Sequence, residues 1–557
     1  ARPGEPPLFG GVLPYIGRAL EFGRDHRALL QRLAARSGAS SPAFTMFVAG
    51  QRMTFVKNPL HFSAVLKEGR QRLQFRPVAN KIMQQAFDCS TADMNGEAYA
   101  GWQRLSPKQW SMLRGKPLLA LMSRTQDELV DALCAQRPPS SGPWHSTDDL
   151  YGVVVDLMWR ATGRSFFGSL FDDANVEKNG EARSTFAGGG SSGSAALGSM
   201  NIAKEAFRTF DEAFPLLAAG VPGKYLPKVP VAMSHLFSRF AHKDGPGVSR
   251  HGASEIVRLR QEFLAAHFDP HSQGSFQLGF VWATMANTLP TAFWSLYFVT
   301  RDREAYAKCR EEADCVMGPW LDKREAAIKA GRGSPAPDAS AVANILSNMP
   351  RLESVVSEAL RMCIASITLR EAMEDFELTL GEQVVRVRRG DHVVLAPTLT
   401  HFDPEIYPDP ESFQWDRFLV PQKDDSADAD NGVDEGNEGK AKEASLSGAR
   451  ALPPRFKSGK KIPPAIALQP FGGGHTMCPG RHFALAEIKA FVALVLCMWD
   501  IEHGDPCVGR KLVMGEAGTP RLEQARAGLG CLPPLKSDKV KCRWRLRRDP
   551  GGLSSGR

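Results

Sequence analysis

Hydrophobic residues recur at helical spacing along most of this 557-residue chain. Apolar positions at i, i+3 and i+4, or near-continuous apolar runs, predict helices in six segments: residues 58–68, 118–135, 202–219, 276–300, 350–363 and 482–498. An apolar stripe with this spacing buries one side of a helix against a core. The pattern therefore predicts a mainly helical protein.

Alternation of apolar and polar residues, which is typical of strands, is confined to three segments. FTMFVAGQRMTFVKNP, residues 44–59, predicts a hairpin that turns around Gly50. FELTLGEQVVRVRRGDHVVLAP, residues 376–397, predicts three short strands with turns at its two glycines. KVKCRWRL, residues 539–546, alternates apolar with basic residues and predicts a half-buried strand with a cationic outer face.

Four segments depart from these patterns within what we interpret as one domain spanning residues 1–557. Residues 187–199 are rich in glycine and serine, which makes a chain flexible. Residues 422–445 are acidic with almost no large apolar side chain, so we expect disorder. Both interrupt patterned chain and are interpreted as surface insertions that serve as spacers, with a regulatory role as the alternative. The proline-rich residues 1–17 predict a stiff hinge that another segment once preceded, and residues 547–557 a disordered tail.

Composition narrows the classes of partner. With 43% apolar and 23% charged residues, the chain is ordinary for a globular protein. Its net charge of +8 suits an acidic protein partner or anionic lipid as well as nucleic acid. The sequence contains no zinc-finger spacing and no basic stripe with interleaved aromatic residues, so nucleic acid is not expected. It also contains no uncharged apolar run of about 18 residues, the length that would predict a transmembrane helix.

Ten cysteines are scattered along the chain, and none forms a C-x-x-C pair. This spacing argues against a zinc cluster or a thioredoxin-like site. So few cysteines in so long a chain indicate a reducing compartment with free, buried thiols. Cys478 is distinctive, because PFGGGHTMCPGRHFA, residues 470–484, places it between three glycines and the start of an apolar segment.

Cys478 could be a nucleophile, a metal ligand or an inert core thiol. A nucleophile needs a histidine base held by a third group, and neither His475 nor His482 is diagnostic of such an arrangement. A thiolate ligand needs a tight loop with backbone amides directed at the sulfur. Glycines permit that loop, and the positive end of the following helix favours the negative charge.

Phe471, Gly474, Cys478 and Gly480 match the pattern F-x-x-G-x-x-x-C-x-G. This stretch resembles the haem-thiolate loop of the cytochrome P-450 superfamily. The resemblance covers essentially the whole chain. It implies the mainly α haem-thiolate fold with a small β-region, and a haem b whose iron is bound by the thiolate of Cys478.

Three further segments match the superfamily in the same order. EALR supplies Glu358 and Arg361 one helical turn apart, a spacing that by itself commonly gives only a solvated ion pair. FQWDRF, residues 413–418, resembles the second arginine segment, so Arg417 is expected to complete a structural Glu–Arg–Arg network. HFDPEIYPDPESF, residues 401–413, has the aspartate–proline spacing of the superfamily.

The resemblance also implies residues that bind the haem propionates. Trp110 and Arg114, in WSMLR, are expected one helical turn apart as one such pair, and Arg370 falls where a second arginine is expected. Arginine suits the task because its planar fork donates two hydrogen bonds to a carboxylate. Thr476 departs from the pattern, since many members have arginine or histidine there. Threonine donates only one neutral hydrogen bond, so the charge pairing is left to the other three residues.

The helix that crosses the haem in the superfamily carries an acid followed by a threonine, which deliver protons to bound dioxygen. Here Ala286 aligns with the acid and Asn287 with the threonine, and Thr288 follows; a shift of one residue would pair Asn287 with the acid and Thr288 with the alcohol. Either way the carboxylate is missing, and an amide does not shuttle protons at neutral pH. A plain structural amide is the other interpretation of Asn287. Pro290 is expected to kink or widen the helix and to free backbone carbonyls.

The chain ends resemble one branch more closely. RPGEPPLFGGVLPYIG, WATMANTLPTAFWSLYF and ARAGLGCLPPL look like the sterol 7α-hydroxylases, and LQFRPVANKIMQQAF looks like the oxysterol enzyme among them. This implies 7α-hydroxylation of a sterol or oxysterol with dioxygen, electrons from NADPH–cytochrome P-450 reductase, and the endoplasmic reticulum membrane. Phe75, Trp282 and Phe293 are expected near a large apolar pocket, and Gly528 and Gly530 in a hairpin that leaves room for rigid rings.

Other functions stay open at this point. The related prostacyclin synthase has the same asparagine and lacks the same acid, and it isomerises an endoperoxide without dioxygen or reductant. The related sterol 12α-hydroxylases and a non-catalytic haem- or sterol-binding protein are further alternatives. The tripeptide Ala286-Asn287-Thr288 and the chain ends favour the hydroxylase.

Overall fold

The computed structural model describes residues 2–11, 13–68, 72–136, 144–171, 195–241, 252–332, 342–343, 347–419, 462–504, 511–516 and 518–548. The two predicted insertions and the predicted tail lie mostly outside these residues. None of the described helices combines the length and apolarity that crossing a bilayer requires.

Helices dominate the described chain, as the apolar periodicity predicted. The longer helices are α1 (Ala19–Arg36), α3 (Arg76–Phe87), α5 (Glu97–Ser111), α6 (Gly115–Ala135), α7 (Leu150–Phe167), α8 (Ala195–Ala218), α9 (Val229–Phe240), α10 (Glu255–His267), α11 (Pro270–Met285), α12 (Thr288–Arg301), α13 (Arg303–Lys329), α15 (Pro350–Cys363) and α18 (Arg481–Met498). The short ones are α2 (Phe62–Lys67), α4 (Thr91–Asn95), α16 (Pro397–His401) and α17 (Pro464–Ala467).

Three sheets contain the strands. The largest has the order β1 (Leu8–Phe9), β2 (Ala43–Val48), β3 (Gln51–Val56), β9 (His392–Leu395), β6 (Thr368–Ala372) and β4 (Leu73–Gln74). A second has the order β10 (Trp499–His503), β11 (Cys542–Leu546) and β5 (His145–Thr147), and β7 (Phe376–Leu380) pairs with β8 (Gln383–Val387). The mainly helical fold with a small β-region is therefore confirmed.

The predicted hairpin and strands form where the alternation placed them. Strands β2 and β3 pair antiparallel across Ala49 and Gly50, both of which have positive φ. Strands β7, β8 and β9 occupy the segment predicted to hold three strands. In β11, Cys542 and Trp544 are buried and Arg543 is exposed, so this strand has the cationic outer face that its alternation indicated.

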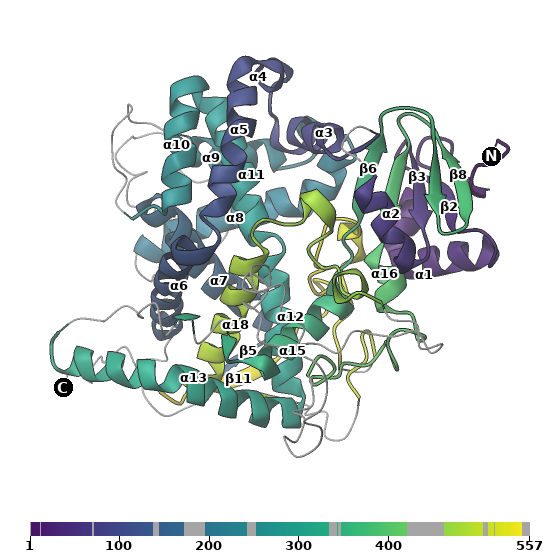
Figure 1. The fold of residues 1–557 in the computed structure, drawn as a ribbon. Coiled ribbons are helices and arrows are strands. Elements are labelled where there is room, and N and C mark those ends of the chain that lie inside the picture. Colours follow the sequence, from purple (N-terminus) through teal and green to yellow (C-terminus); the bar gives the residue numbers. More distant parts are fainter. Residues whose placement is uncertain are drawn as a thin grey trace, which may run out of the picture.

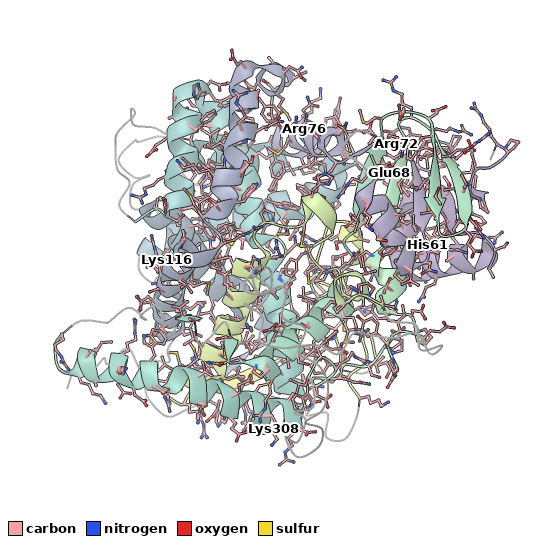
Figure 2. All side chains as sticks on the ribbon, viewed as in Figure 1. His61, Glu68, Arg72, Arg76, Lys116 and Lys308 are labelled. Atoms are coloured by element: carbon pink, nitrogen blue, oxygen red, sulfur yellow. The ribbon has the colours of Figure 1, made fainter. Side chains whose placement is uncertain are left out.

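The large sheet and α1 lie on one side of the molecule, and the helical bundle with α5, α9, α10 and α11 lies on the other (Figure 1). Helix α12 packs against α7, α15 and α18 in the middle of the bundle. The main hydrophobic core runs through these central helices. Side chains fill the space between the ribbons, while Lys116 and Lys308 are exposed on outer surfaces (Figure 2).

The proline-rich amino-terminal segment packs against the large sheet. Strand β1 pairs in parallel with β2, and the Glu5 carboxylate accepts hydrogen bonds from Arg388 Nε at 2.5 Å and from Arg52 Nη2 at 3.2 Å. The Glu5 side chain is only 2% exposed. These contacts fix the segment on the sheet.

A small cluster separate from the main core joins two distant parts of the chain. Phe418, Ile462 and Ala467 are buried together with Ile406 and Tyr407. Phe418 precedes the acidic insertion predicted from the sequence, and Ile462 follows it. The chain therefore leaves and re-enters the described structure at one site.

Candidate functional site

A cavity of about 280 Å³ lies where α11, α12, α15, α18 and β6 meet the loop before α18. Its walls are mostly apolar. The described lining residues are Phe75, Leu113, Phe166, Ala283, Thr284, Asn287, Thr288, Thr291, Leu360, Ile364, Ser366, Ile367, Thr368, Leu369, Arg370, Pro470, Phe471, Gly472, Thr476, Cys478, Gly480, Phe483, Ala484, Ile488, Leu529 and Gly530. No aspartate or glutamate is among them.

The loop that carries Cys478 folds as its glycines predicted. Gly472 and Gly474 have φ of +71° and +67°, a conformation that other residues adopt only with strain. The turn closes because the Cys478 N–H donates to the Phe471 carbonyl at 2.9 Å. The loop thus turns Cys478 into the wall of the cavity.

Gly480 lies between Cys478 and the first residue of α18. Its φ is −85°, and it caps the amino end of α18. A Cβ atom at this position would lie 3.9 Å from the Cys478 Sγ and 3.9 Å from Leu113, which is ordinary van der Waals contact. Neighbouring protein atoms therefore do not require a glycine at position 480.

Opposing influences act on the Cys478 thiol. Burial is the largest and raises the pKa of this thiol, while the backbone N–H groups of Gly480 and Arg481 and the charge of Arg481 lower it. The helix end therefore favours the thiolate, as the sequence predicted. It does not outweigh burial in the protein alone.

Arg370 and Thr476 interact directly, which the sequence did not indicate. Arg370 is 2% exposed, and its guanidinium donates to the Thr476 hydroxyl, to the Leu369 carbonyl at 2.8 Å and to the Gly473 carbonyl at 3.3 Å. No described acidic side chain forms an ion pair with Arg370. Burial lowers the pKa of this guanidinium. Among the described residues, the buried cation in the cavity wall is hydrogen-bonded by neutral oxygens and lies over the Phe75 ring.

Trp110 and Arg114 are not one turn apart on one helix, as the sequence interpretation had them. Helix α5 ends at Ser111, and Arg114 lies beyond it in extended backbone before α6. Gly115, the first residue of α6, has a φ of +55°. Neither residue lines the cavity, but Leu113 between them does. Arg114 is exposed.

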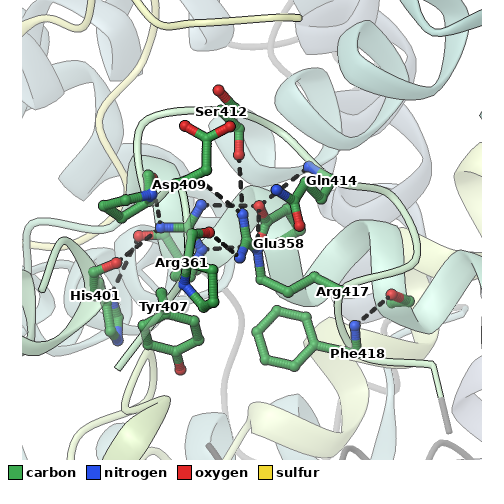
Figure 3. A network of polar contacts seen from close by, with 12 residues as sticks. Glu358, Arg361, His401, Tyr407, Asp409, Ser412, Gln414, Arg417 and Phe418 are labelled. Carbon is green, nitrogen blue, oxygen red and sulfur yellow. Dashed lines mark hydrogen bonds and ion pairs between the residues drawn. The ribbon is translucent and has the colours of Figure 1, made fainter. Parts of the chain in front are cut away.

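The predicted Glu–Arg–Arg network is present (Figure 3). Arg361 grips the Glu358 carboxylate with two hydrogen bonds of 2.7 and 2.8 Å, and Arg417 Nε adds a third at 2.9 Å. Both Glu358 and Arg361 are fully buried. Their interaction is therefore not the solvated ion pair that the spacing alone would suggest.

The remaining donors of the two arginines bind backbone carbonyls of the segment 401–413. Arg361 Nη1 donates to the His401 and Pro410 carbonyls, each at 2.8 Å, and Arg417 Nη1 donates to the Pro408 carbonyl at 2.8 Å (Figure 3). The network thus holds this irregular segment against α15. Since α15 also lines the cavity through Leu360, the network stabilises a helix that forms part of the cavity wall.

The long apolar segment predicted as one helix is divided into α11 and α12 at Ala286 and Asn287. Pro290 explains the division, because it has no N–H to donate to the Ala286 carbonyl four residues earlier. Arg526 Nη2 approaches that carbonyl at 3.5 Å instead. The predicted kink and the freed carbonyl are both present.

The structure places the three candidate catalytic residues differently. Asn287 and Thr288 line the cavity with Cys478, whereas Ala286 does not. The Asn287 Oδ1 accepts a hydrogen bond from the Cys531 N–H at 3.0 Å. Asn287 is therefore tied to a neighbouring loop and also lines the cavity.

Sequence reasoning missed several lining residues and misplaced others. Thr284 and Thr291 face the cavity one helical turn before and after Thr288, a spacing that the sequence shows. Phe75 lines the cavity as expected. Trp282 instead stacks on Phe214, and Phe293 is fully buried against Tyr151. Gly530 lines the cavity, and Gly528 does not.

These features fit a haem. The cavity offers one sulfur ligand at Cys478, apolar walls for a planar ring, and in Arg370 a buried cation suited to a carboxylate. Thr476, bonded to Arg370, adds a hydroxyl at the same wall. Phe471 lines the cavity at the start of the loop that carries Cys478, residues 470–480, which we call the sulfur loop. Gly474 has positive φ within this loop.

Comparison with known proteins gives the same assignment. A family model described as Cytochrome P450 matches residues 275–508. Cytochrome P450 7A1 of Rattus norvegicus is 31% identical over 97% of this chain and 93% of its own length. Cytochrome P450 7B1 of Mus musculus is 29% identical over 90% of this chain and 85% of its length. A 5-beta-cholestane-3-alpha,7-alpha-diol 12-alpha-hydroxylase of Sus scrofa is 30% identical over 98% and 94%.

Proposed function

Since the chain belongs to the cytochrome P450 family, whose members hold a haem through a cysteine thiolate, we propose that it hydroxylates a sterol or oxysterol at the 7α position. Its relatives include proteins named for sterol 7α- and 12α-hydroxylation. One structural observation carries the proposal: Cys478 and the pair Asn287–Thr288 line the same mostly apolar cavity. A thiolate ligand and a polar site thus share one apolar space.

In the proposed enzyme, haem supplies the iron at which dioxygen is activated. Cys478 would bind that iron, and Arg370 with Thr476 would bind a propionate. Trp110 and Arg114 stay candidates for the other propionate. Because the cavity walls are mostly apolar, they exclude bulk water from the reacting substrate.

Polar groups of α11 and α12 would hold and transfer the protons that the reaction needs. No described carboxylate lines the cavity, so no described Asp or Glu can donate a proton there. The Asn287 amide donates and accepts hydrogen bonds without titrating. We assign it to hold an oxygen in place, and assign the Thr288 hydroxyl to relay a proton from ordered water or from a substrate hydroxyl.

The apolar cavity suits a rigid hydrocarbon. Leu529 and Gly530 enter from the hairpin, and Phe75 and Phe483 form other parts of the wall. A sterol would bury its rings against such a surface, at about 25 cal/mol per Å² of apolar area. By family resemblance, NADPH–cytochrome P450 reductase would supply electrons at the endoplasmic reticulum membrane.

Turnover with a sterol panel tests the proposed reaction. The panel contains cholesterol, a side-chain oxysterol and 7α-hydroxycholest-4-en-3-one, each with NADPH and reductase under air and under nitrogen. The expected result is a 7α-hydroxylated product that requires both air and NADPH. Product at carbon 12 would select the 12α-hydroxylase, which the pig relative supports. Rearrangement of an endoperoxide without NADPH would select an isomerase, and binding without turnover would select a non-catalytic protein.

The ligand assignment has its own test. Cys478→Ser is expected to abolish the thiolate-shifted Soret band of the reduced carbon monoxide complex, because serine supplies no thiolate to the iron. Cys315→Ser is the matched control, since Cys315 is an exposed cysteine on α13. Retention of the shifted band in Cys478→Ser would contradict the assignment.

A further inference from the structure

The cavity hairpin, residues 522–534, reaches the cavity from a distant part of the chain. Its ends pair as an antiparallel bridge between Leu522 and Pro534, and its tip brings Leu529 and Gly530 into the cavity wall. The short 3-10 helix Gln524–Arg526 lies between the first end of the hairpin and this tip. Any contact that fixes Arg526 therefore also acts on the part of the hairpin that lines the cavity.

Arg526 is held by a partly buried ion pair with α8. Its Nη1 donates to the Asp211 carboxylate, and the side chains are 7% and 20% exposed. Trp282 Nε1 donates to the other carboxylate oxygen at 2.9 Å. Burial raises the pKa of Asp211 and the charge of Arg526 lowers it. Trp282 of α11 and Arg526 of the hairpin thus both donate to the carboxylate of Asp211 on α8.

The same guanidinium contacts the break between α11 and α12. Its Nη2 lies 3.5 Å from the Ala286 carbonyl, the carbonyl that Pro290 leaves without a helical N–H. A single planar side chain thereby joins Asp211 to the freed carbonyl. Arginine suits this position because its fork directs donors to two acceptors at once.

A second contact from the hairpin orients the adjacent Asn287. The Cys531 N–H donates to the Asn287 Oδ1 at 3.0 Å. A backbone N–H only donates, so this contact identifies the bound atom as the amide oxygen. The Asn287 NH₂ group is then the part left to donate elsewhere. Gly530 makes room, since a Cβ atom there would overlap the Asn287 Oδ1 at 1.8 Å.

We infer that Asp211 and Arg526 are positioning residues for Asn287: their ion pair holds the cavity hairpin against the α11–α12 break, so that the Asn287 amide presents an N–H donor to the cavity. Neither residue is among those that line the cavity. Both act through Ala286, Gly530 and Cys531. The inference concerns this chain's own residues, and only its turnover arm rests on the proposed sterol hydroxylation.

Three variants distinguish a role in positioning Asn287 from a role in stabilising the fold. Arg526→Gln and Asp211→Asn each remove the ion pair. Arg526→Lys keeps the charge opposite Asp211 but loses the planar fork that also reaches Ala286. The matched control is Arg324→Gln, because Arg324 is a 3% exposed arginine that pairs with Asp127 and Asp131 between α13 and α6.

The first measurement needs no sterol. The carbon–oxygen stretching frequency of the reduced carbon monoxide complex responds to hydrogen-bond donors beside the bound gas. It is expected to rise in Arg526→Gln, Asp211→Asn, Arg526→Lys and Asn287→Ala, and to stay at the wild-type value in Arg324→Gln. The thiolate-shifted Soret band, expected in all of them, shows that the haem site is intact.

The second measurement is the hydrogen peroxide released per NADPH oxidised during sterol turnover. A misplaced donor is expected to raise this ratio by about tenfold in Arg526→Gln with KM changed less than about twofold. The inference is overturned if Arg526→Gln matches Arg324→Gln in both measurements. Should wild type hydroxylate no sterol, the proposed function fails, and the stretching frequency alone decides the inference.

Discussion

Glycine at position 530 leaves space for one particular side chain, that of Asn287. Gly530→Ala is expected to displace the Asn287 amide and to lower turnover by about tenfold or more, measured as sterol product formed per minute per haem. Gly528→Ala is the control. Gly528 also has positive φ, but a Cβ atom there would meet Phe22 at 3.6 Å, an ordinary contact.

Both alanine variants carry backbone strain, because both glycines have positive φ. Gly530→Ala should lose more stability toward urea, since its Cβ atom also overlaps the Asn287 side chain. Turnover should separate them, because only Gly530→Ala moves Asn287. Equal turnover in the two variants would contradict this role of Gly530.

Thr476 has a role that its departure from the family pattern did not reveal. It accepts a hydrogen bond from the buried Arg370. Thr476→Val is expected to cost about 1–3 kcal/mol of unfolding free energy, because a charged donor loses its acceptor. Urea denaturation of the haem-loaded protein measures the loss. Thr54→Val, which removes a neutral hydrogen bond of 2.9 Å to Thr45, is expected to cost less, and the reverse order would argue against the proposed pairing.

At the scale of single residues, the sulfur loop was predictable because its residues are neighbours in the sequence. Contacts between residues far apart in the sequence were not predictable. Glycine permits the positive φ found at Gly472 and Gly474. The tie between Cys531 and Asn287 joins residues 244 positions apart, and no local pattern encodes it. The contact of Arg370 with Thr476 spans 106 positions and was hidden for the same reason.

Helix α12 begins where Pro290 fails to supply an N–H. Pro290→Ala restores that donor, which is expected to compete with Arg526 for the Ala286 carbonyl and to extend regular helix across Ala286–Asn287. Alanine also favours helix over proline by about 3 kcal/mol in a helix interior. We expect a more stable protein with lower sterol turnover.

Hydrogen exchange of the amides at 286–291 checks this expectation, since a continuous helix protects them more strongly. Pro319→Ala on α13 is a suitable control, because it relieves a proline inside a helix away from the cavity lining. If Pro290→Ala kept full turnover with stronger protection, the break would have no part in catalysis.

Helix interiors were predictable from periodicity, and helix ends much less so. Helix α15, residues 350–363, has the predicted bounds because Pro350 starts it and the apolar stripe ends at Cys363. The sequence predicted Trp110 and Arg114 one turn apart on one helix, and this was wrong, because α5 ends between them at Ser111. The apolar spacing continues past Ser111 and so does not mark this end.

The Glu–Arg–Arg network joins α15 to the irregular segment before the sulfur loop. Glu358→Gln is expected to reduce the unfolding free energy by about 3–5 kcal/mol, since two buried arginines lose their countercharge. Urea denaturation of the haem-loaded protein gives the value. Glu353→Gln, which removes the partner of a single lysine, Lys489, is the control with the smaller expected loss. A larger loss in the control would contradict this ranking.

Acid stability has a defined contribution from the amino-terminal segment. Arg388, with help from Arg52, lowers the pKa of Glu5 from 4.5 to about 2. A lowered pKa in the folded state means that the ionised carboxylate stabilises the fold. This stabilisation is complete well above pH 4.5 and is lost as the pH falls toward 2.

Glu5→Gln should therefore be less stable than wild type near neutral pH, and the difference should shrink as the pH falls below about 4.5. Urea midpoints of both proteins between pH 3 and 7 measure it. A difference that stays constant over this range would show that Glu5 acts through packing and not through its charge.

The small cluster that contains both Phe418 and Ile462 has a practical consequence for engineering this enzyme. Because the two flanks of the acidic insertion meet there, a short Gly/Ser linker can join them without moving either flank far. Halving the length of a flexible loop changes its closure free energy by only about 0.6 kcal/mol. The position is therefore suitable for shortening the chain before crystallisation, or for inserting a fluorescent reporter, because none of the described cavity-lining residues lies between Phe418 and Ile462.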